Sequence, residues 1–356
     1  MHVPYARRSA ALFLVSIHAN CATTTPPRRS GVFAQDRWQL SMRKSLDGFA
    51  VSSMVLLCLI WGLQQAAMKS IAADVAPMLQ VSLRSGVAAV LVWVFGRLIV
   101  RDKWIAGVAL WPGSPIGVLF AAEFLFVAEG LRYTTASHMA VFLYTAPMFA
   151  AIGLQIALPA ERLTRAQWTG IAIAFVGIVI TFVGPTAGGG AGPTAQNWML
   201  GDLLGLCAGA AWGLTTVAVR ATRLSDAPAT QTLFYQLVWA FVVLLPFAVL
   251  TGQFAFHGTR MVWASLGFQA LVVCFFSYVA WFYLLRVYLA SRLGVLSFMA
   301  PLFGVALGAL LLHERLDPTF LAGGALVLAG MLVVNGREWL KFVFTRQRRD
   351  GKIGSV

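Results

Sequence analysis

The sequence predicts an all-α polytopic membrane protein whose ten transmembrane helices form two inverted five-helix repeats. Of its 356 residues, 59% are hydrophobic and 11% charged, and the mean hydropathy is +0.77. A chain of this composition has more apolar surface than one soluble core can bury. The apolar residues fall into ten runs of roughly 20 residues, the length of a helix that crosses a bilayer. The second half also repeats the first, which indicates a duplicated architecture.

The clearest sign of the duplication is the stretch Leu131–Phe149, which recurs as Leu285–Phe303 with eight of nineteen positions identical. Shortly after each copy the chain reads Glu-Arg-Leu, at Glu161–Leu163 and at Glu314–Leu316. A pair of glycines follows each of these: Gly170 and Gly177 in the first half, Gly323 and Gly330 in the second. Self-similarity at a fixed period, here about 151–154 residues, identifies a repeat architecture.

The ten apolar runs define the expected helices in chain order. In the first half they lie at residues 48–68, 77–96, 115–131, 135–159 and 166–184. In the second half they lie at residues 199–219, 230–251, 262–285, 292–312 and 319–336. We therefore assign residues 48–184 to a first repeat and residues 199–336 to a second. The segment 185–198 between them is uncharged and rich in Gly and Pro, as expected of a linker.

Both ends of the chain are basic. Residues 1–46 carry seven Arg and Lys residues and one acidic residue, and their apolar piece at residues 10–19 is too short to span a bilayer. No convincing signal-peptide cleavage site follows that piece. We expect a disordered cytoplasmic tail here, or translation that begins instead at Met42. Residues 337–356 are expected to form a second basic cytoplasmic tail.

The distribution of Lys and Arg predicts that both termini are cytoplasmic. With that orientation, twenty-two of the 27 Lys and Arg residues lie on the cytoplasmic side, and only four lie in outer connections. Five helices per repeat is an odd number, so the two repeats must cross the membrane in opposite directions. Inverted repeats of this kind place a binding site near the midplane, at interrupted helices. Pro147 and Pro301, each near the centre of its apolar run, mark the expected helix interruptions.

The order of motifs resembles that of an EamA-type domain of the drug/metabolite transporter superfamily. In the first half, Trp-Gly at residues 61–62 is followed by LRYTTASH at 131–138, a central Ala-Pro, Glu-Arg-Leu and a closing span with paired glycines. The second half repeats this order, with Trp-Gly at 212–213 and LRVYLASR at 285–292. Each motif alone is weak. The common order, found twice over residues 48–336, is specific.

The resemblance implies a secondary transporter that moves small metabolites, such as amino acids or related compounds, by alternating access and commonly outward. It implies a multi-pass protein of the cell (inner or plasma) membrane, with the lipid bilayer and a small-molecule substrate as partners. Protons are a candidate coupling ion, and no cofactor is expected. A membrane channel or facilitator is the main alternative left open, because a selectivity filter needs no long motif. A membrane-embedded enzyme, which would need clustered His, Asp or Glu residues, is the weaker alternative. Saturable counterflow would distinguish a carrier from an open pore.

Polar and aromatic residues inside the spans are the candidates for substrate binding or for the transport pathway. The set comprises Trp61, Gln64, Arg84, Glu123, Tyr144, Trp212, Thr215 and Tyr278. Glu123 is the strongest candidate, because a charged side chain costs about 2.5–3.5 kcal/mol at the centre of a membrane helix. The two tryptophans, at equivalent positions of the repeats, can equally be packing anchors. Lys69 and Arg220 end their spans, where snorkelling to the interface is the default expectation.

Arg84 and Glu123 are expected at matching depth in the membrane. Arg84 lies seven residues from the outer end of its span, about 10 Å deep, and Glu123 eight residues from the outer end of the next, about 12 Å deep. Charged groups in a bilayer face the interior and tend to pair, so we expect the two to meet or to share a water-filled cavity. Two interpretations stay open: the pair couples transport to a proton or a cationic substrate group, or it is a structural ion pair.

Several functional classes find no support in the sequence. The net charge of +14 comes mostly from tails and short loops, without a basic stripe interleaved with aromatic residues, which argues against nucleic-acid binding. The four cysteines are isolated, so neither a metal site nor a disulfide framework is expected. The five histidines are scattered and catalytic motifs are missing, so we expect no catalytic residues and no enzyme.

Glu161 and Glu314 are expected to cap helices or to pair within their short loops.

Overall fold

The computed structural model describes residues 47–109, 111–157, 163–183, 197–288, 293 and 296–334. Within these ranges the regular structure is helical, apart from isolated β-bridges such as the one between Val75 and Phe256. The all-α prediction is therefore confirmed for this part of the chain. The two predicted tails, nearly all of the predicted linker and Glu161 lie outside the described residues.

Seven of the described helical spans are long and apolar enough to cross a membrane. In chain order they are α3 (Gly48–Ser70), α4 (Pro77–Val94) with its π-helical continuation η1 (Phe95–Ile99), α5 (Gly113–Gly130), α6 (Ala136–Leu143) with α7 (Ala146–Ala157), α9 (Trp198–Arg220), α10 (Ala229–Leu250), and α11 (Arg260–Gly267) with the π-helix η4 (Phe268–Ser277) and α12 (Tyr278–Val287). A 3-10 turn, η3 (Arg223–Asp226), precedes α10. Three further apolar helices are α8 (Arg165–Val183), α14 (Met299–Leu312) and the last helix, Pro318–Val334. Each of these helices falls on one of the ten predicted runs.

Local capping explains where several helices begin. Asp47 accepts a hydrogen bond from the backbone N–H of Ala50 (2.8 Å) at the start of α3. The hydroxyl oxygen of Thr135 accepts one from the N–H of His138 (3.1 Å) at the start of α6. Both side chains satisfy an N–H group that has no partner inside its helix. Pro77 is the first residue of α4, a position that does not need a donor N–H.

The fourth helical span of each half is interrupted. In the first half Tyr144 and Thr145 separate α6 from α7, and Pro147 follows as the second residue of α7. In the second half a turn at residues 297–298 precedes α14, of which Pro301 is the third residue. Each proline lies in the first turn of the helix after the interruption, where its missing N–H is tolerated. The discontinuities therefore lie two to four residues before the prolines and not at them.

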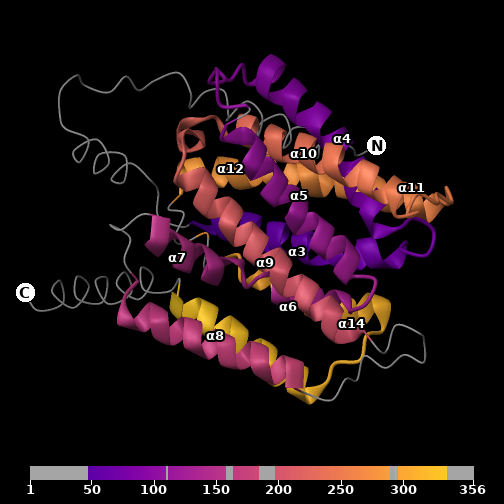
Figure 1. Ribbon diagram of the computed structural model, residues 1–356, viewed down its shortest axis with the longest axis vertical. Helices are drawn as coiled ribbons and strands as arrows, with labels where there is room; N and C mark the ends of the chain where they lie inside the picture. Colours follow the sequence, from indigo (N-terminus) through magenta and orange to yellow (C-terminus); the bar gives the residue numbers. More distant parts are fainter. Residues whose placement is uncertain are drawn as a thin grey trace, which may run out of the picture.

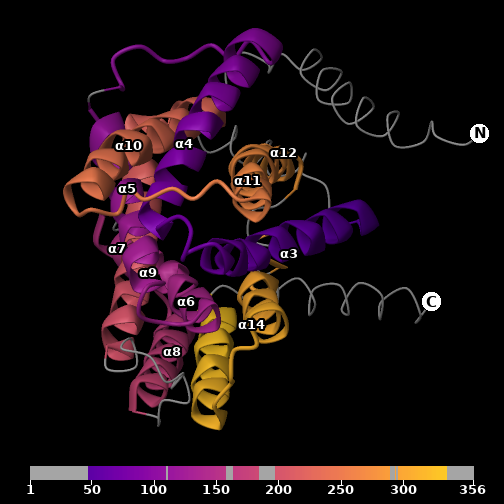
Figure 2. The same cartoon turned by 90° about the vertical axis from the view of Figure 1, so that its right-hand side faces the viewer.

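The first helix of each half packs against the interrupted helix of the other half. α3 packs along α14, and α9 packs along α6 and α7. Figure 2 shows both pairs, with α3 beside α14 and α9 beside α6. On the other side of the bundle α4 and α5 pack on α10, while η4 contacts both α3 and α4. Figure 1 shows α9 crossing the middle of the bundle between these two groups of helices.

Glycines permit the close approach at these crossings. A Cβ added to Gly62 of α3 would lie 2.7 Å from the backbone nitrogen of Gly304. A Cβ added to Gly213 of α9 would lie 2.7 Å from the carbonyl oxygen of Ala146. The two Trp-Gly dipeptides thus occupy equivalent crossings, at which only a hydrogen on Cα fits between the backbones.

The closing helices of the two halves pack directly on each other, in the lower part of Figure 1. A Cβ added to Gly170 would lie 2.6 Å from the carbonyl oxygen of Gly330, and one added to Gly177 would lie 2.6 Å from that of Gly323. The glycine pair of each half therefore faces the pair of the other half. Small residues at a membrane helix interface allow such backbone contact.

Candidate functional site

Two opposite charges lie in the interior of the bundle, on helices that follow each other in the chain. Arg84 on α4 is 1% exposed and Glu123 on α5 is 5% exposed. The guanidinium carbon of Arg84 lies 4.7 Å from the ring centroid of Phe124, and Nη1 lies 3.7 Å from the sulfur of Met68. Phe124 directly follows Glu123 in α5, so Arg84 reaches the part of α5 that carries the carboxylate. Nε of Arg84 and Oε2 of Glu123 have no hydrogen-bond partner within the described part of the chain. The two groups therefore do not form an ion pair, and a shared water-filled cavity stays a prediction.

Two tyrosines lie near these charges. Tyr144 occupies the break between α6 and α7, and Tyr278 begins α12 directly after the π-helix η4. Tyr278 packs against the hydrophobic cluster that contains Phe124, and Tyr144 contacts Trp212, which packs against the same cluster. π-helices and interrupted helices are frequent at functional sites of membrane proteins. Four of the predicted residues therefore share one interior region.

The two equivalent tryptophans contact different partners. The indole N–H of Trp61 donates to the hydroxyl of Ser277 (2.9 Å), and its ring meets that of Trp281 edge-on at 5.6 Å. Trp212 instead meets the ring of Tyr144 edge-on at 5.4 Å. Both tryptophans are half-buried. Each one links its own half of the chain to the interior of the other half.

The remaining predicted residues are less informative. Thr215 is buried, but its hydroxyl donates to the carbonyl of Ala211 in its own helix (2.8 Å). Gln64 is buried on α3 at 6% exposure. Its neighbour Gln65 is buried at 3%, and Oε1 of Gln65 has no partner among the described residues. Gln65 is therefore the better candidate for a polar contact with a ligand.

A second polar cluster lies at one end of the bundle, where α3 ends and where α6 and α9 begin. The ammonium of Lys69 donates to the carbonyl oxygens of Leu131 (3.1 Å) and Thr134. Asp202, which is fully buried, accepts a hydrogen bond from the hydroxyl of Thr134, and its Oδ2 lies 2.8 Å from Nδ1 of His138. The snorkelling expected of Lys69 is wrong, because the carbonyls at the end of α5 offer acceptors within its reach.

Glu314 completes this cluster from the second half of the chain. Its Oε1 accepts from the backbone N–H of Ala136 (2.7 Å), and its Oε2 accepts from the N–H (3.0 Å) and the hydroxyl (2.6 Å) of Ser137. A carboxylate is favourable at the first turn of a helix, where N–H groups lack partners and the dipole is positive. Of the two expectations for Glu314, helix capping is confirmed, and the helix that it caps belongs to the other half of the chain. We call Lys69, Thr134, His138, Asp202 and Glu314 the end cluster.

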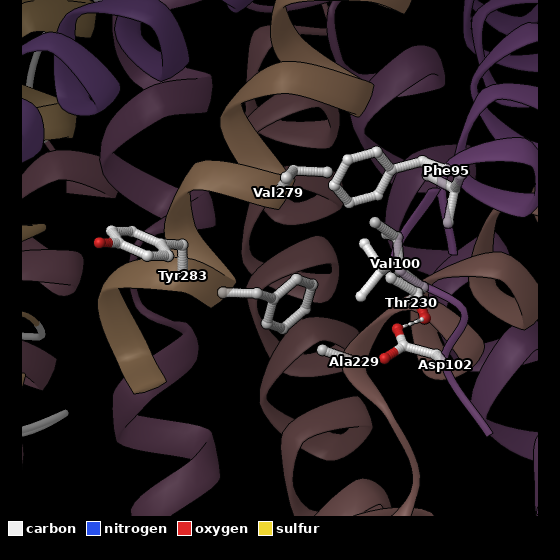
Figure 3. A pocket seen from close by; sticks show the side chains of 10 residues that line it. Phe95, Val100, Asp102, Ala229, Thr230, Val279 and Tyr283 are labelled. Atoms are coloured by element: carbon white, nitrogen blue, oxygen red, sulfur yellow. Dashed lines mark hydrogen bonds between the residues drawn. The ribbon is translucent and has the colours of Figure 1, made fainter. Parts of the chain in front are cut away.

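A pocket lies at the opposite end of the bundle, where α4 ends and α10 begins (Figure 3). Its apolar wall comprises Val92, Phe95, Val100, Ala229, Leu233, Val279 and Phe282, and its polar residues are Asp102, Thr230 and Tyr283. The hydroxyl of Thr230 donates to Asp102 (2.7 Å), the hydrogen bond drawn in Figure 3. Phe95 and Val279 face each other across the pocket in this view. Because α4 runs from the end cluster to this pocket, the two features mark opposite ends of the same interior.

One contact joins α3 to the segment after α12 near this second end. The hydroxyl of Tyr288 donates to both carboxylate oxygens of Asp47 (2.9 Å each). Burial, together with the neighbouring carboxylate, raises the pKa of Tyr288 to about 12. The phenol therefore stays neutral and keeps donating at physiological pH.

Sequence reasoning missed the end cluster and a pair of buried glutamines. Ala-Pro-x-x-Gln occurs at residues 76–80 and again at 227–231, so the repeat itself marks Gln80 and Gln231. Gln80 donates to the carbonyl oxygens of Met68, in the last turn of α3, and of Val75, in the α3–α4 connection. Gln231 exchanges two hydrogen bonds with the backbone of Ile105. Both glutamines are fully buried and tie the start of a helix to a loop. Comparison of the two halves would have identified them.

The described residues contain no group of three or more His, Cys, Asp or Glu side chains that could hold a metal ion. Cys58, Cys207 and Cys274 are free thiols.

A duplicated bundle of apolar helices, with charges in its interior and different structures at its two ends, is the construction of a multi-pass membrane transport protein. Comparison with known families agrees. The EamA-like transporter family matches residues 48–183 and residues 199–336, one match for each half. These matches cover most of the chain, and the protein belongs to the EamA-like transporter family. The family is one of transporters and not of enzymes.

Curated relatives bear names of the same kind. A Salmonella typhimurium protein named "Probable amino-acid metabolite efflux pump" is 28% identical over 298 residues, which are 81% of this chain and 94% of the relative. An Escherichia coli protein of the same name is 27% identical over 301 residues, or 81% of this chain and 96% of the relative. An "Uncharacterized transporter" of Archaeoglobus fulgidus is 28% identical and covers 79% of this chain. A solved crystal structure with 19% identity, covering 80% of this chain and 94% of its own, has a TM-score of 0.54 and shows the fold alone.

Proposed function

We propose that this protein is a secondary transporter that exports amino acids or related small metabolites across the cell membrane. In this proposal the seven long apolar spans and the three further apolar helices form ten transmembrane segments, arranged as two inverted repeats. Both termini lie in the cytoplasm, as the excess of Lys and Arg in the expected cytoplasmic segments favours. The names of the Salmonella and Escherichia coli relatives support the substrate class and the outward direction.

The difference between the two ends of the interior is the observation that carries the proposal. At one end Glu314 of the second repeat caps α6 of the first repeat, and Lys69 and Asp202 add further hydrogen bonds. At the other end lies the pocket between α4, α10 and α12. In the proposed orientation the bonded end is outer and the pocket is cytoplasmic. The described conformation then represents a state that loads substrate from the cytoplasm, as an exporter requires.

Alternating access requires that the bonded end can open while the pocket closes. Hydrogen bonds are suited to such an end, because each contributes only about 0.5–1.5 kcal/mol net and can be exchanged for water. The close glycine contacts between α3 and α14, and between α9 and α7, allow two smooth helix surfaces to move past each other as rigid bodies. Protons are the proposed coupling ion, with Glu123 as the buried carboxylate that would carry them.

The test compares metabolites in the medium of cells that lack the protein, cells that overproduce it, and cells that overproduce a Glu314→Ala variant. We expect overproduction to raise one or a few amino-acid-like metabolites in the medium, and the variant to raise them less. Purified protein in proteoliposomes should then show saturable counterflow of the same compound. Non-saturable flux would identify a channel or facilitator instead. An unchanged medium together with absent counterflow would contradict the proposal.

A further inference from the structure

Arg84 and Glu123 present two opposite charges that the protein itself leaves without full partners. Nε of Arg84, Oε2 of Glu123 and Oε1 of Gln65 lack hydrogen-bond partners among the described residues, and all three side chains are at least nine-tenths buried. Leaving buried charges and polar groups unpaired is costly, so a site of this kind is usually completed by something that binds there. The missing partners are an anion for Arg84 and a cation for Glu123.

The contacts of Arg84 leave its hydrogen-bonding edges available to a carboxylate. One face of the guanidinium lies on the ring of Phe124, which fixes the plane without using an N–H group. Nη1 points to the sulfur of Met68 at 3.7 Å, and a thioether is a weak acceptor that a carboxylate replaces readily. A planar guanidinium held in this way is suited to bidentate binding of a carboxylate.

The surroundings of Glu123 suit an ammonium group. Tyr278 packs against the hydrophobic cluster that contains Phe124, and the ring of Tyr144 meets Trp212, which packs against the same cluster. The hydroxyl oxygens of both tyrosines can accept N–H bonds. The faces of these aromatic rings also attract a cation. The region therefore offers an acceptor-rich subsite close to the donor-rich edge of Arg84.

An α-amino acid carries both complementary groups at a fixed short separation, because only one carbon atom lies between its ammonium nitrogen and its carboxylate carbon. Arg84 likewise lies on the ring of Phe124, the residue that follows Glu123 in α5, yet Arg84 and Glu123 do not form an ion pair. A zwitterion placed between them would satisfy both charges at once. A simple amine or a simple acid would leave one charge without its partner, which is unfavourable in a buried site.

We propose that Arg84 and Glu123 form the subsite for the zwitterionic head of an α-amino acid, with Arg84 binding the carboxylate and Glu123 binding the ammonium. The inference rests on the proposed transport function and narrows its substrates to compounds that retain both charged groups. The side chain of the substrate lies against the apolar and aromatic groups of the interior, which include Met68 and Phe124.

The experiment measures binding to purified full-length protein in detergent, through the shift of its thermal unfolding midpoint. Each of the twenty L-amino acids is titrated as a probe. The amino acid that stabilises the wild type most is then compared with its amide, which lacks the carboxylate, and with its deaminated acid, which lacks the ammonium. We expect the amino acid to bind at least about tenfold more tightly than either analogue, because each analogue leaves one buried charge unpaired.

Two variants assign the roles of the charges. Arg84→Gln should abolish the preference over the amide while retaining the preference over the deaminated acid, and Glu123→Gln should do the reverse. The matched control is Glu129→Gln: Glu129 lies on the same helix as Glu123, and the substitution removes its ion pair with Arg132. This variant should keep both preferences. A general loss of folding cannot produce such opposite changes in selectivity. Arg84→Lys and Glu123→Asp replace any variant that does not fold, and each is expected to weaken binding while keeping both preferences.

Several outcomes would overturn the inference. The first is that none of the twenty amino acids stabilises the wild type. The second is that the amide or the deaminated acid binds as well as the parent amino acid, and the third is that both variants change selectivity in the same way. If cells export a metabolite that lacks one of the two charges, the subsite is wrong and the transport function stands. If neither export nor counterflow occurs, the transport function itself has failed.

Discussion

The two repeats share their scaffold but not their charges. Ser277 in the second repeat and Glu123 in the first both lie eight residues before the Leu-Arg pair that marks the duplication, so they are equivalent. Trp61 donates to Ser277, whereas no hydrogen bond joins the equivalent pair, Trp212 and Glu123, in the part of the chain that the structure describes. The same position thus completes a hydrogen bond in one repeat and holds an unpaired carboxylate in the other.

Arg84 shows the same difference. It lies four residues after Gln80, and its counterpart four residues after Gln231 is Tyr235. The Tyr235 hydroxyl accepts a hydrogen bond from Gln231 (3.0 Å), while Nε of Arg84 has no partner among the described residues. Duplication therefore accounts for the architecture, and the divergence of two positions accounts for the buried charges. We infer that symmetry provides the two alternating states and asymmetry provides the recognition of the solute.

The largest expected effect comes from the shared scaffold. Gly62→Ala and Gly213→Ala should each destabilise the folded protein by about 1–3 kcal/mol, because the new Cβ would lie within 3 Å of backbone atoms that cannot rotate away. The thermal unfolding midpoint in detergent measures this. Gly48→Ala is the control, since a Cβ there meets nothing within 4 Å. Strongly unequal effects at the two equivalent glycines would contradict a shared scaffold.

The next largest effect comes from making the repeats alike at the charged position. Glu123→Ser installs the residue of the second repeat and should lower counterflow of the exported metabolite at least about tenfold, with a smaller effect on folded yield. Ser277→Ala, at the equivalent position, should lower counterflow less, because it removes a hydrogen bond and no charge. Transport is normalised to the amount of folded protein in each preparation. Equal losses for the two variants would argue that both repeats contribute alike.

The fold was largely predictable because hydropathy and repetition act over long stretches of sequence. Ten apolar runs and the recurrence of Leu131–Phe149 were sufficient to place the helices, whose described ends agree with expectation to within a few residues. The cost of burying a charge was sufficient to select Arg84 and Glu123, which the structure buries close together. These inferences depend on properties that each residue or segment carries by itself.

The rest of the site depends on contacts between distant segments, for which the sequence offers no local signal. Glu314 and the helix that it caps are almost 180 positions apart, and a loop glutamate beside an arginine gives no indication of that partner. Asp202 is different: a lone carboxylate in an apolar run, it meets the same criterion that selected Glu123 and was overlooked. The π-helix η4 ends at Ser277 and directly precedes Tyr278. Its amino-acid composition does not distinguish it from the α-helices around it.

A smaller effect is expected at the outer end in the proposed orientation. Glu314→Ala removes three hydrogen bonds to Ala136 and Ser137, so this end should open more often. Labelling of a Gln65→Cys variant by a membrane-impermeant maleimide added outside should then become at least about tenfold faster, because three bonds of about 0.5–1.5 kcal/mol each contribute at least about 1.5 kcal/mol to closure.

Asp102→Ala provides the matched control for that measurement. It removes the hydrogen bond with Thr230 at the pocket end and should not accelerate labelling from the outside. Labelling of the protein without Gln65→Cys supplies the background from its own thiols, which include the half-buried Cys207. Equal acceleration by both substitutions would mean that the end cluster does not control this end specifically.

The smallest effect concerns the two tryptophans, where the repeats differ by one hydrogen bond. Trp61→Phe keeps an aromatic ring but removes the donor to Ser277, and one net hydrogen bond of about 0.5–1.5 kcal/mol corresponds to a change of about two- to tenfold in the counterflow rate. Trp212→Phe keeps the edge-on ring contact with Tyr144 and should change the rate by less than about twofold. The double variant Trp61→Phe/Ser277→Ala should lower the counterflow rate no more than either single change, because both changes remove the same hydrogen bond. A larger loss of counterflow for Trp212→Phe than for Trp61→Phe would contradict this expectation. It would mean that the indole N–H of Trp212 donates a hydrogen bond in another conformation, to Glu123, the residue equivalent to Ser277.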